Sequence, residues 1–282
     1  MTKKILSIYY PASVPRRTGF QKWQCLKGYD AARVVSDSGR VKLVHCCFKA
    51  KNRGAAGKKI LFFSDLHYSA REKELGDELC SVVEKIKPDV LLSGGDICSD
   101  ALSIDALAPV LERLSAAVGF CVSVPGNWER GKTWLPVAFW EQFMARHRWH
   151  YLCNKSLELE DWGWVYGCDD ISKGFPAVPE VFPAGLEKIF LVHRPDTVIA
   201  LDRDKKLDPF TLALCGHTHG GQIRLPLIGA VLVPSFYGRR LDCGLFGKGS
   251  SDTRMLISTG VNHASFPLRI NCRREIILIE FE

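Results

Sequence analysis

The feature that most constrains the fold of this chain is a set of apolar runs. Each run ends in a residue of a type that can bind a metal ion. Five such runs occur, and each closes on aspartate, asparagine or histidine at Asp65, Asp96, Asn127, His193 and His217. Two further histidines, His67 and His219, follow two residues after Asp65 and His217. Short apolar runs predict buried strands, so these polar side chains are expected just beyond strand ends.

The spacing between the runs predicts alternating strands and helices. Strands are expected over 41–48, 59–65, 89–96 and 119–127. A helix is expected over 70–87, a second is expected to begin at an N-cap on Ser103, and a third is expected over 136–147. The alternation favours a largely parallel central sheet. Beyond residue 150, short strands with few helices between them, including one over 229–234, favour mixed or antiparallel pairing. The fold class is therefore α/β, or α+β.

Composition and charge narrow the class of protein. The 282 residues carry a formal net charge of +7, which favours an anionic ligand or surface, but no dense basic tract predicts nucleic-acid binding. The 11 cysteines are odd in number and contain no CxxC pair, which favours reduced thiols. No apolar run reaches the length of a membrane span, and Pro11 interrupts the N-terminal apolar stretch. We expect a cytoplasmic protein, with peripheral contact at the inner membrane face as an option. Residues 1–40 are expected to be an N-terminal extension and 41–282 one domain.

The donor types at the strand ends predict a metal site. Two aspartates, one asparagine and four histidines without cysteine suit Mn, Fe, Zn or Mg better than a structural zinc site. Seven donors exceed the needs of one ion, but they suit two ions that share one carboxylate. Two cations in one site can clamp a phosphoryl group and activate water. Each motif alone is weak evidence, whereas the ordered set predicts hydrolysis of a phosphate ester or anhydride.

The segments FSDLH, GGD, GN, VHRPD and CGHTHGGQ together resemble the motif set of the calcineurin-like binuclear metallophosphoesterases. The resemblance covers residues 41–282 and implies a four-layer sandwich of two mixed β-sheets flanked by helices. It implies two divalent metal ions, with Mn favoured over Mg, Fe or Zn, and catalytic roles for Asp96 and Asn127. The implied ligands of one ion are Asp65, His67 and His219. Those of the other are Asn127, His193 and His217, and Asp96 is the implied bridge.

A narrower resemblance concerns GHTHGGQIRLPLIG, followed by GRR, GLF and FPLRINCRREIILI. These segments are similar to a bacterial branch with the YkuE- and YaeI-type phosphoesterases and the chlamydial-type UDP-2,3-diacylglucosamine pyrophosphatase of lipid A synthesis. That resemblance implies release of UMP and an acylated sugar 1-phosphate. One alternative is a broad-specificity phosphodiesterase or phosphatase. Another is a scaffold without turnover, against which the complete donor set argues.

Trp128 departs from the family pattern. The family usually has histidine after Gly-Asn, where it lies near the phosphate and is assigned to protonate the leaving group, whereas this chain reads Gly126-Asn127-Trp128-Glu129. A missing acid costs less when the leaving group is itself a phosphate, whose second pKa is about 6. Trp128 therefore favours a phosphoanhydride substrate. Its indole is expected either to stack on the substrate or to pack within the protein.

Further substrate contacts are expected from basic and apolar segments. Arg194, Arg239 and Arg240 are candidate phosphate contacts, with ordinary surface charge as the alternative. The aromatic segment 133–152 and the apolar segment 223–240 predict either buried faces or a surface for acyl chains and anionic headgroups. The expected partner is a small-molecule or lipid-linked phosphate.

Overall fold

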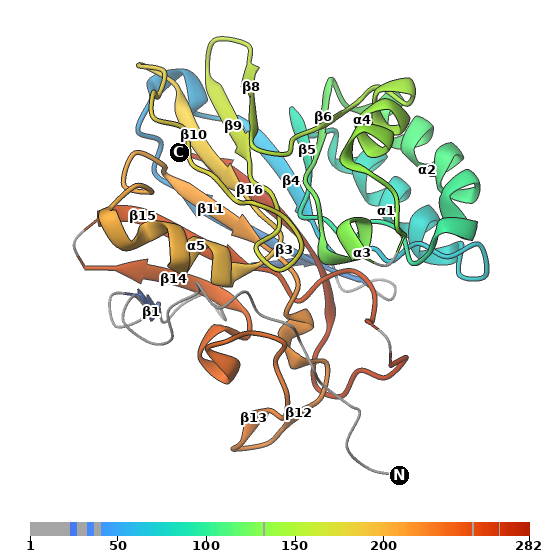
Figure 1. The fold of residues 1–282 in the computed structure, drawn as a ribbon. Coiled ribbons are helices and arrows are strands. Elements are labelled where there is room, and N and C mark those ends of the chain that lie inside the picture. Colours follow the sequence, from blue (N-terminus) through green and yellow to red (C-terminus); the bar gives the residue numbers. More distant parts are fainter. Residues whose placement is uncertain (1–22, 27–32, 37–40, 132, 250, 265) are drawn as a thin grey trace.

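Two seven-stranded β-sheets form the centre of the computed structural model, which describes residues 23–26, 33–36, 41–131, 133–249, 251–264 and 266–282 (Figure 1). Across the first sheet, the strands are β2 (Arg33–Ser36), β3 (Val41–Phe48), β16 (Arg274–Phe281), β4 (Lys59–Phe63), β5 (Val90–Ser93), β6 (Phe120–Ser123) and β7 (Trp149–Tyr151). Across the second, they are β1 (Trp23–Cys25), β14 (Gly244–Lys248), β15 (Ser251–Ile257), β11 (Leu212–Cys215), β10 (Glu187–Leu191), β9 (Gly163–Gly167) and β8 (Lys155–Leu159). Both sheets are mixed, with β4–β7 parallel in the first and β9, β10, β11 and β15 parallel in the second.

Helices cover the outer faces of both sheets, which completes four layers. The helices α1 (Glu74–Ile86), α2 (Ile104–Ala117) and α4 (Val137–Arg146) pack on the first sheet, and α5 (Pro195–Leu201) packs on the second (Figure 1). Successive residues of β4 serve two layers, because Leu61 and Phe63 pack with the helices while Ile60 and Phe62 pack between the sheets. The predicted four-layer sandwich is confirmed.

Short elements connect these layers near the strand ends. α3 (Asn127–Gly131) begins shortly after β6 ends at Ser123, so the strand expected over 119–127 is shorter than predicted. The 3₁₀ turns are η3 (Arg53–Ala55), η4 (Ala101–Ser103), η5 (Asp202–Asp204), η6 (His219–Gly221) and η7 (Gly238–Leu241). A separate two-stranded hairpin joins β12 (Arg224–Leu225) to β13 (Gly229–Ala230).

Three helix predictions need correction. α1 begins at Glu74 instead of Ala70, because Tyr68 forms a bridge with Cys98 and a turn follows at Ser69. Ser103 is in the N-cap position of α2 as predicted, but its hydroxyl accepts the Ala70 N–H at 3.3 Å instead of an N–H of the helix. α4 begins at Val137, with Pro136 just before its first residue, and α5 was not expected.

The predicted strand over 229–234 is also wrong. Only Gly229–Ala230 is in a strand, and it pairs with β12 outside both sheets. Pro226 and Pro234 bracket the apolar run, and proline cannot donate to a ladder. The side chains of Val231 and Leu232 are consequently exposed instead of packed in a core.

The remaining predictions concern the aromatic segment, the N-terminal extension, membrane spans and the cysteines. Within the aromatic segment 133–152, Trp140 and Phe143 of α4 and Trp149 of β7 are buried in the core, so this part is not an acyl groove. Most of the predicted extension over 1–40 lies outside the described residues; within it, β1 pairs with β14 and β2 with β3. No helix in the described ranges combines the length and apolar character that a bilayer crossing requires. Each of the 11 cysteines, all within the described residues, is a free thiol.

Candidate metal centre

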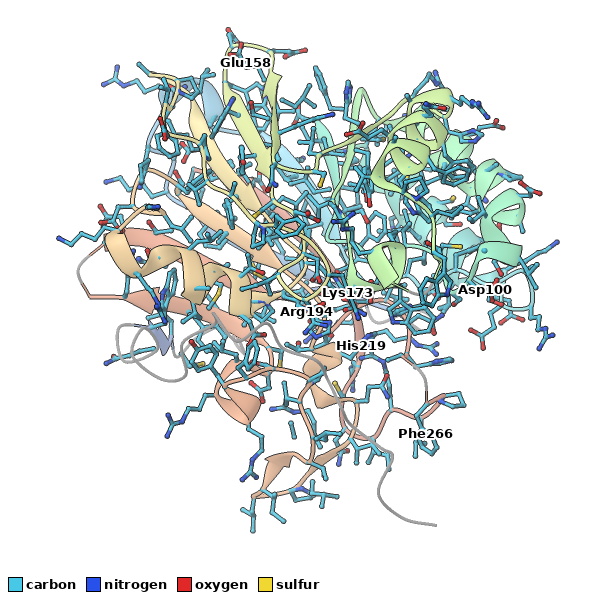
Figure 2. All side chains as sticks on the ribbon, in the orientation of Figure 1. Asp100, Glu158, Lys173, Arg194, His219 and Phe266 are labelled. Atoms are coloured by element: carbon cyan, nitrogen blue, oxygen red, sulfur yellow. The ribbon has the colours of Figure 1, made fainter. Side chains whose placement is uncertain are left out.

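The polar residues that follow five of the strands meet at one edge of the two sheets. β4, β5 and β6 run parallel in the first sheet, and β10 and β11 run parallel in the second, so their carboxyl ends share this edge. Figure 2 shows Arg194 and His219 at this edge, whereas Glu158 lies at the far end of the strands. The polar residues after these strands are thereby concentrated in one place.

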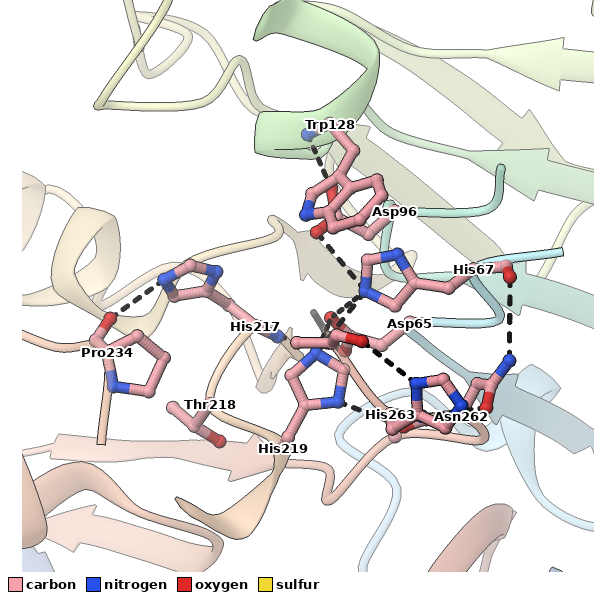
Figure 3. Close-up of polar contacts among 12 residues, drawn as sticks. Asp65, His67, Asp96, Trp128, His217, Thr218, His219, Pro234, Asn262 and His263 are labelled. Carbon is pink, nitrogen blue, oxygen red and sulfur yellow. Dashed lines mark hydrogen bonds and ion pairs between the residues drawn. The ribbon is translucent and has the colours of Figure 1, made fainter. Parts of the chain in front are cut away.

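The first cluster of donors, which we call group one, consists of Asp65, His67 and His219. Their ligand atoms all lie within 4.8 Å of one another, and all three residues are buried. His219 Nε2 lies 3.3 Å from His67 Nε2 and 3.3 Å from Asp65 Oδ1 (Figure 3). The three residues therefore converge as the sequence predicted.

The second cluster, group two, consists of Asn127, His193 and His217. His193 Nε2 lies 3.1 Å from Asn127 Oδ1 and 3.2 Å from His217 Nδ1. Asp96 lies between the groups, because its Oδ2 is 3.3 Å from His193 Nε2 and 3.7 Å from His67 Nε2. All seven predicted donors are thus brought to one site, with Asp96 in the shared position.

Backbone carbonyls fix the orientation of three imidazoles. His193 Nδ1 donates to Gly94 O at 2.8 Å, and His217 Nε2 donates to Pro234 O at 2.8 Å. His219 Nδ1 faces Asn262 O at 3.0 Å, and we assign its proton to this bond. The other ring nitrogen of each histidine then presents a lone pair to the site, as metal-ligating histidines do.

This arrangement of acceptors fits cations. The lone pairs of His193 Nε2 and His217 Nδ1 face each other, with Asn127 Oδ1 at 3.1 Å from the former. Asp65 Oδ1 is buried without a hydrogen-bond partner among the described residues and faces the His219 lone pair. Acceptors packed this closely repel one another unless positive charge lies between them. The donor set, with its oxygen and imidazole ligands, suits two divalent metal ions.

The pKa values of the site histidines are shifted in two directions. Burial lowers the pKa of His219 to about 4 and, together with Arg194, holds that of His217 well below its usual range, so both rings are neutral near pH 7. Burial would also lower the pKa of His193, but the Asp96 carboxylate outweighs it and raises that pKa. The carboxylate that favours a proton on His193 favours a cation in the same position.

Five of the donors have strained backbones. Asp65, His67, Asp96, His217 and His219 all have φ between 41° and 69°. Left-handed backbone is uncommon for residues other than glycine and is concentrated at functional sites. Glycine allows the loops to come this close, since a Cβ on Gly95 would lie 2.8 Å from Gly126 N. The fold thus holds the backbone of these loops in unusual conformations at the positions of the donor side chains.

Glu129 is a functional residue that sequence reasoning missed. Its buried carboxylate accepts the N–H groups of Asp96 at 2.9 Å, Ile97 at 2.7 Å and Gly126 at 2.8 Å. It therefore ties the loop that carries Asp96 to the start of α3. The available signal was an acidic residue beside Gly126-Asn127, in the first turn of a short helix.

The four candidate substrate contacts have different positions. The Trp128 indole packs on His67, with ring centroids 4.4 Å apart, and the Trp128 backbone N–H donates to Asp96 Oδ1 at 2.8 Å. Arg194 is buried, pairs with Asp170 at 3.1 Å and reaches Asn127 Oδ1 at 3.3 Å. Arg239 and Arg240 are exposed on η7, and Arg239 donates to the Ile228 carbonyl. The structure brings Trp128 and Arg194 to the donors, but places Arg239 and Arg240 at the hairpin.

Comparisons with known proteins agree with this geometry. The sequence profile described as calcineurin-like phosphoesterase matches residues 58–221. The chain belongs to the calcineurin-like phosphoesterase family. Phosphodiesterase YaeI of Escherichia coli (strain K12) is 30% identical over 244 residues, which cover 80% of this chain and 83% of YaeI. The metallophosphoesterase YkuE of Bacillus subtilis (strain 168) is 30% identical over 79% of this chain and 78% of YkuE. A solved dimetal phosphatase from Danio rerio has a TM-score of 0.44 and 10% identity, over 73% of this chain and 88% of that chain.

Membership of the family makes this chain a metal-dependent phosphoester hydrolase. The matched residues 58–221 include every donor of both groups, together with Asp96. The donor geometry and the family thus agree on one site and one class of reaction.

Proposed function

We propose that this phosphoesterase hydrolyses a phosphoanhydride, and that its substrate is of the UDP-2,3-diacylglucosamine type. The products would be UMP and an acylated sugar 1-phosphate. The observation that carries the proposal is the Trp128 indole against His67, because position 128 then supplies no acid to a leaving group.

The cations are proposed at the two donor groups, with Mn²⁺ favoured over Mg²⁺, Fe or Zn²⁺. Group one and group two would each hold one ion, and Asp96 would serve both. When bound, two such ions supply Lewis acidity toward phosphoryl oxygens and lower the pKa of water. The imidazoles of His217 and His219, which burial keeps neutral and backbone carbonyls orient, are ready for this role without rearrangement.

Arg194 is proposed to orient the phosphoryl group. Its guanidinium is held by Asp170 and ends beside Asn127, at the edge of group two. A guanidinium fixed in this way can pair with phosphate oxygens without losing much side-chain freedom. Its burial keeps bulk water away from the same contact.

The rate cost of having tryptophan at position 128 depends on the leaving group of the substrate. A positioned general acid contributes roughly 10²–10⁴-fold in rate when an alkoxide departs. A departing phosphate, with a second pKa of about 6, leaves as an anion and gains little from such an acid. Tryptophan at this position therefore costs an anhydride hydrolase much less than an alkyl phosphodiesterase.

A second candidate is hydrolysis of phosphodiesters. The observation that favours it is the 30% identity to a relative named phosphodiesterase. Under this alternative, the missing acid at position 128 would have to be compensated. Either another side chain would protonate the leaving group, or the leaving alcohol would be acidic enough to depart without a proton.

Mass spectrometry of product release distinguishes these candidates. The purified chain with added Mn²⁺ is incubated with UDP-2,3-diacylglucosamine and, separately, with bis-p-nitrophenyl phosphate. We expect UMP from the former at a higher kcat/KM, and no product with the Asp96→Asn control. Turnover of the diester alone would favour the second candidate, and inactivity on both with full metal content would contradict both.

A further inference from the structure

A cluster of exposed apolar side chains lies beside the metal centre. We call it the apolar rim, and it consists of Leu225, Leu227, Ile228, Val231, Leu232 and Phe266. Leu227 is fully exposed, while Leu232 and Phe266 are 62% and 60% exposed. The hairpin β12–β13 projects from the same edge where the donor-bearing strands end, and Phe266 projects beyond His219 (Figures 1 and 2). An apolar surface of this kind marks an interaction site.

The two loops that carry the rim form one ordered surface. Arg224 N donates to Ile270 O at 2.9 Å, and Ile270 N donates to Gln222 O at 2.9 Å. The Gln222 side-chain amide also donates to Phe266 O at 3.1 Å. The rim is therefore held in place by backbone pairing, which lowers the entropy cost of docking.

Basic residues predominate around the rim, although Arg224 pairs with Asp242 at 2.7 Å. Residues 222–241 and 263–274 each contain three arginines, and neither segment contains aspartate or glutamate. Arg239 and Arg240 are exposed on η7, and Arg239 is bonded to Ile228 at the hairpin tip. Apolar side chains bordered by arginines complement an anionic bilayer, where the former enter the interface and the latter meet headgroup phosphates.

The rim is structurally continuous with the metal centre. The carbonyl of Pro234, a short distance along the chain after β13, accepts the His217 Nε2 proton, and the carbonyl of Asn262, close in sequence to Phe266, faces His219 Nδ1. A surface that receives these loops would therefore lie close to the metal centre. A second copy of the chain fits less well, because a symmetric contact would place the arginines of both copies together.

We propose that the apolar rim docks this phosphoesterase on an anionic lipid bilayer, with Arg239 and Arg240 at the headgroups. The metal centre then lies close to the bilayer surface. Docking does not rest on the proposed substrate, because vesicle binding is measured without turnover.

The test is co-sedimentation of the full chain with phosphatidylcholine vesicles that contain or lack phosphatidylglycerol. We expect binding to the anionic vesicles, weakened by salt because headgroup charges are screened. The double variant Leu227→Asp/Ile228→Asp should lower partition by at least roughly tenfold, since it removes two inserted apolar side chains. Arg239→Glu/Arg240→Glu should lower the preference for phosphatidylglycerol by roughly fivefold per arginine.

A matched control is Val181→Asp, which changes an equally exposed apolar residue next to Phe182 on the outer face of the second sheet. It should bind vesicles like the wild type. Leu227→Asp/Ile228→Asp and Val181→Asp should hydrolyse bis-p-nitrophenyl phosphate normally, which shows that the centre is intact. The proposal is overturned if the wild type ignores both vesicle types, or if Leu227→Asp/Ile228→Asp binds undiminished. It is also overturned if that variant changes only the oligomeric state seen by light scattering.

Discussion

The two donor groups differ in how firmly the protein holds them. In group two, His193 and His217 each donate to a backbone carbonyl, and Asn127 is backed by Arg194 and Asp170. In group one, Asp65 Oδ1 and His67 Nδ1 are buried without hydrogen-bond partners in the part of the chain that the structure describes. Group two is thus preorganised by the polypeptide, whereas group one depends more on its cation. We expect the ion in group one to be the weaker.

The largest effect is expected from the residue that the groups share. Asp96→Asn should lower kcat/KM by at least about 10³-fold, since each cation contributes several kcal/mol at about 1.4 kcal/mol per tenfold. Steady-state kinetics with Mn²⁺ would measure the loss. Asp100→Asn is the control, because Asp100 only caps η4 through the Ser103 N–H. A variant of Asp96 with near-normal turnover would show that the groups do not depend on one carboxylate.

The arginine behind each group provides the next comparison. Arg194→Met leaves the buried Asp170 carboxylate without its ion pair, so the free energy of unfolding should fall by about 3–5 kcal/mol. Arg269 instead donates to the carbonyls of Thr259 and Asn262, so Arg269→Met should cost only about 1–3 kcal/mol. Urea unfolding of both variants checks the order. Equal losses would mean that the two groups are braced to the same degree.

The smallest effect is expected beside group one, at Trp128. Trp128→His should raise hydrolysis of an alkyl phosphodiester by roughly 10²-fold, the lower range of general acid catalysis, with little change on an anhydride. The ratio of kcat/KM for the two substrates is the measurement. Trp128→Phe keeps an aromatic ring near His67 without a proton donor and should leave the ratio unchanged. A uniform effect on both substrates would show that the missing acid does not set the leaving-group preference.

Sequence reasoning located the donors because the physics there is local. An apolar run followed by a polar residue predicts a buried strand and its end, and parallel pairing then brings those ends to one edge. For this reason Asp65, Asp96 and His217 could be predicted to meet. Their strained backbones left no comparable signal, apart from the neighbouring glycines.

What the sequence could not predict depends on distant or ambiguous partners. Pro234 and Asn262 orient His217 and His219 through backbone carbonyls, which no side-chain pattern reports. The buried role of Glu129 depends on N–H groups about 30 residues earlier in the chain. The run GAVLVP has the composition of a buried strand, and only the fold shows that Val231 and Leu232 face outward.

Cation titration of the half-site variants tests the central claim most directly. Competition between the protein and a chelator for Mn²⁺ should reveal two ions per chain whose affinities differ by roughly 10–100-fold. His219→Ala, in group one, should lose the weaker ion, and His217→Ala, in group two, the tighter one. A single ion in the wild type, or loss of the same ion in both variants, would contradict a centre of two unequally braced groups that share Asp96.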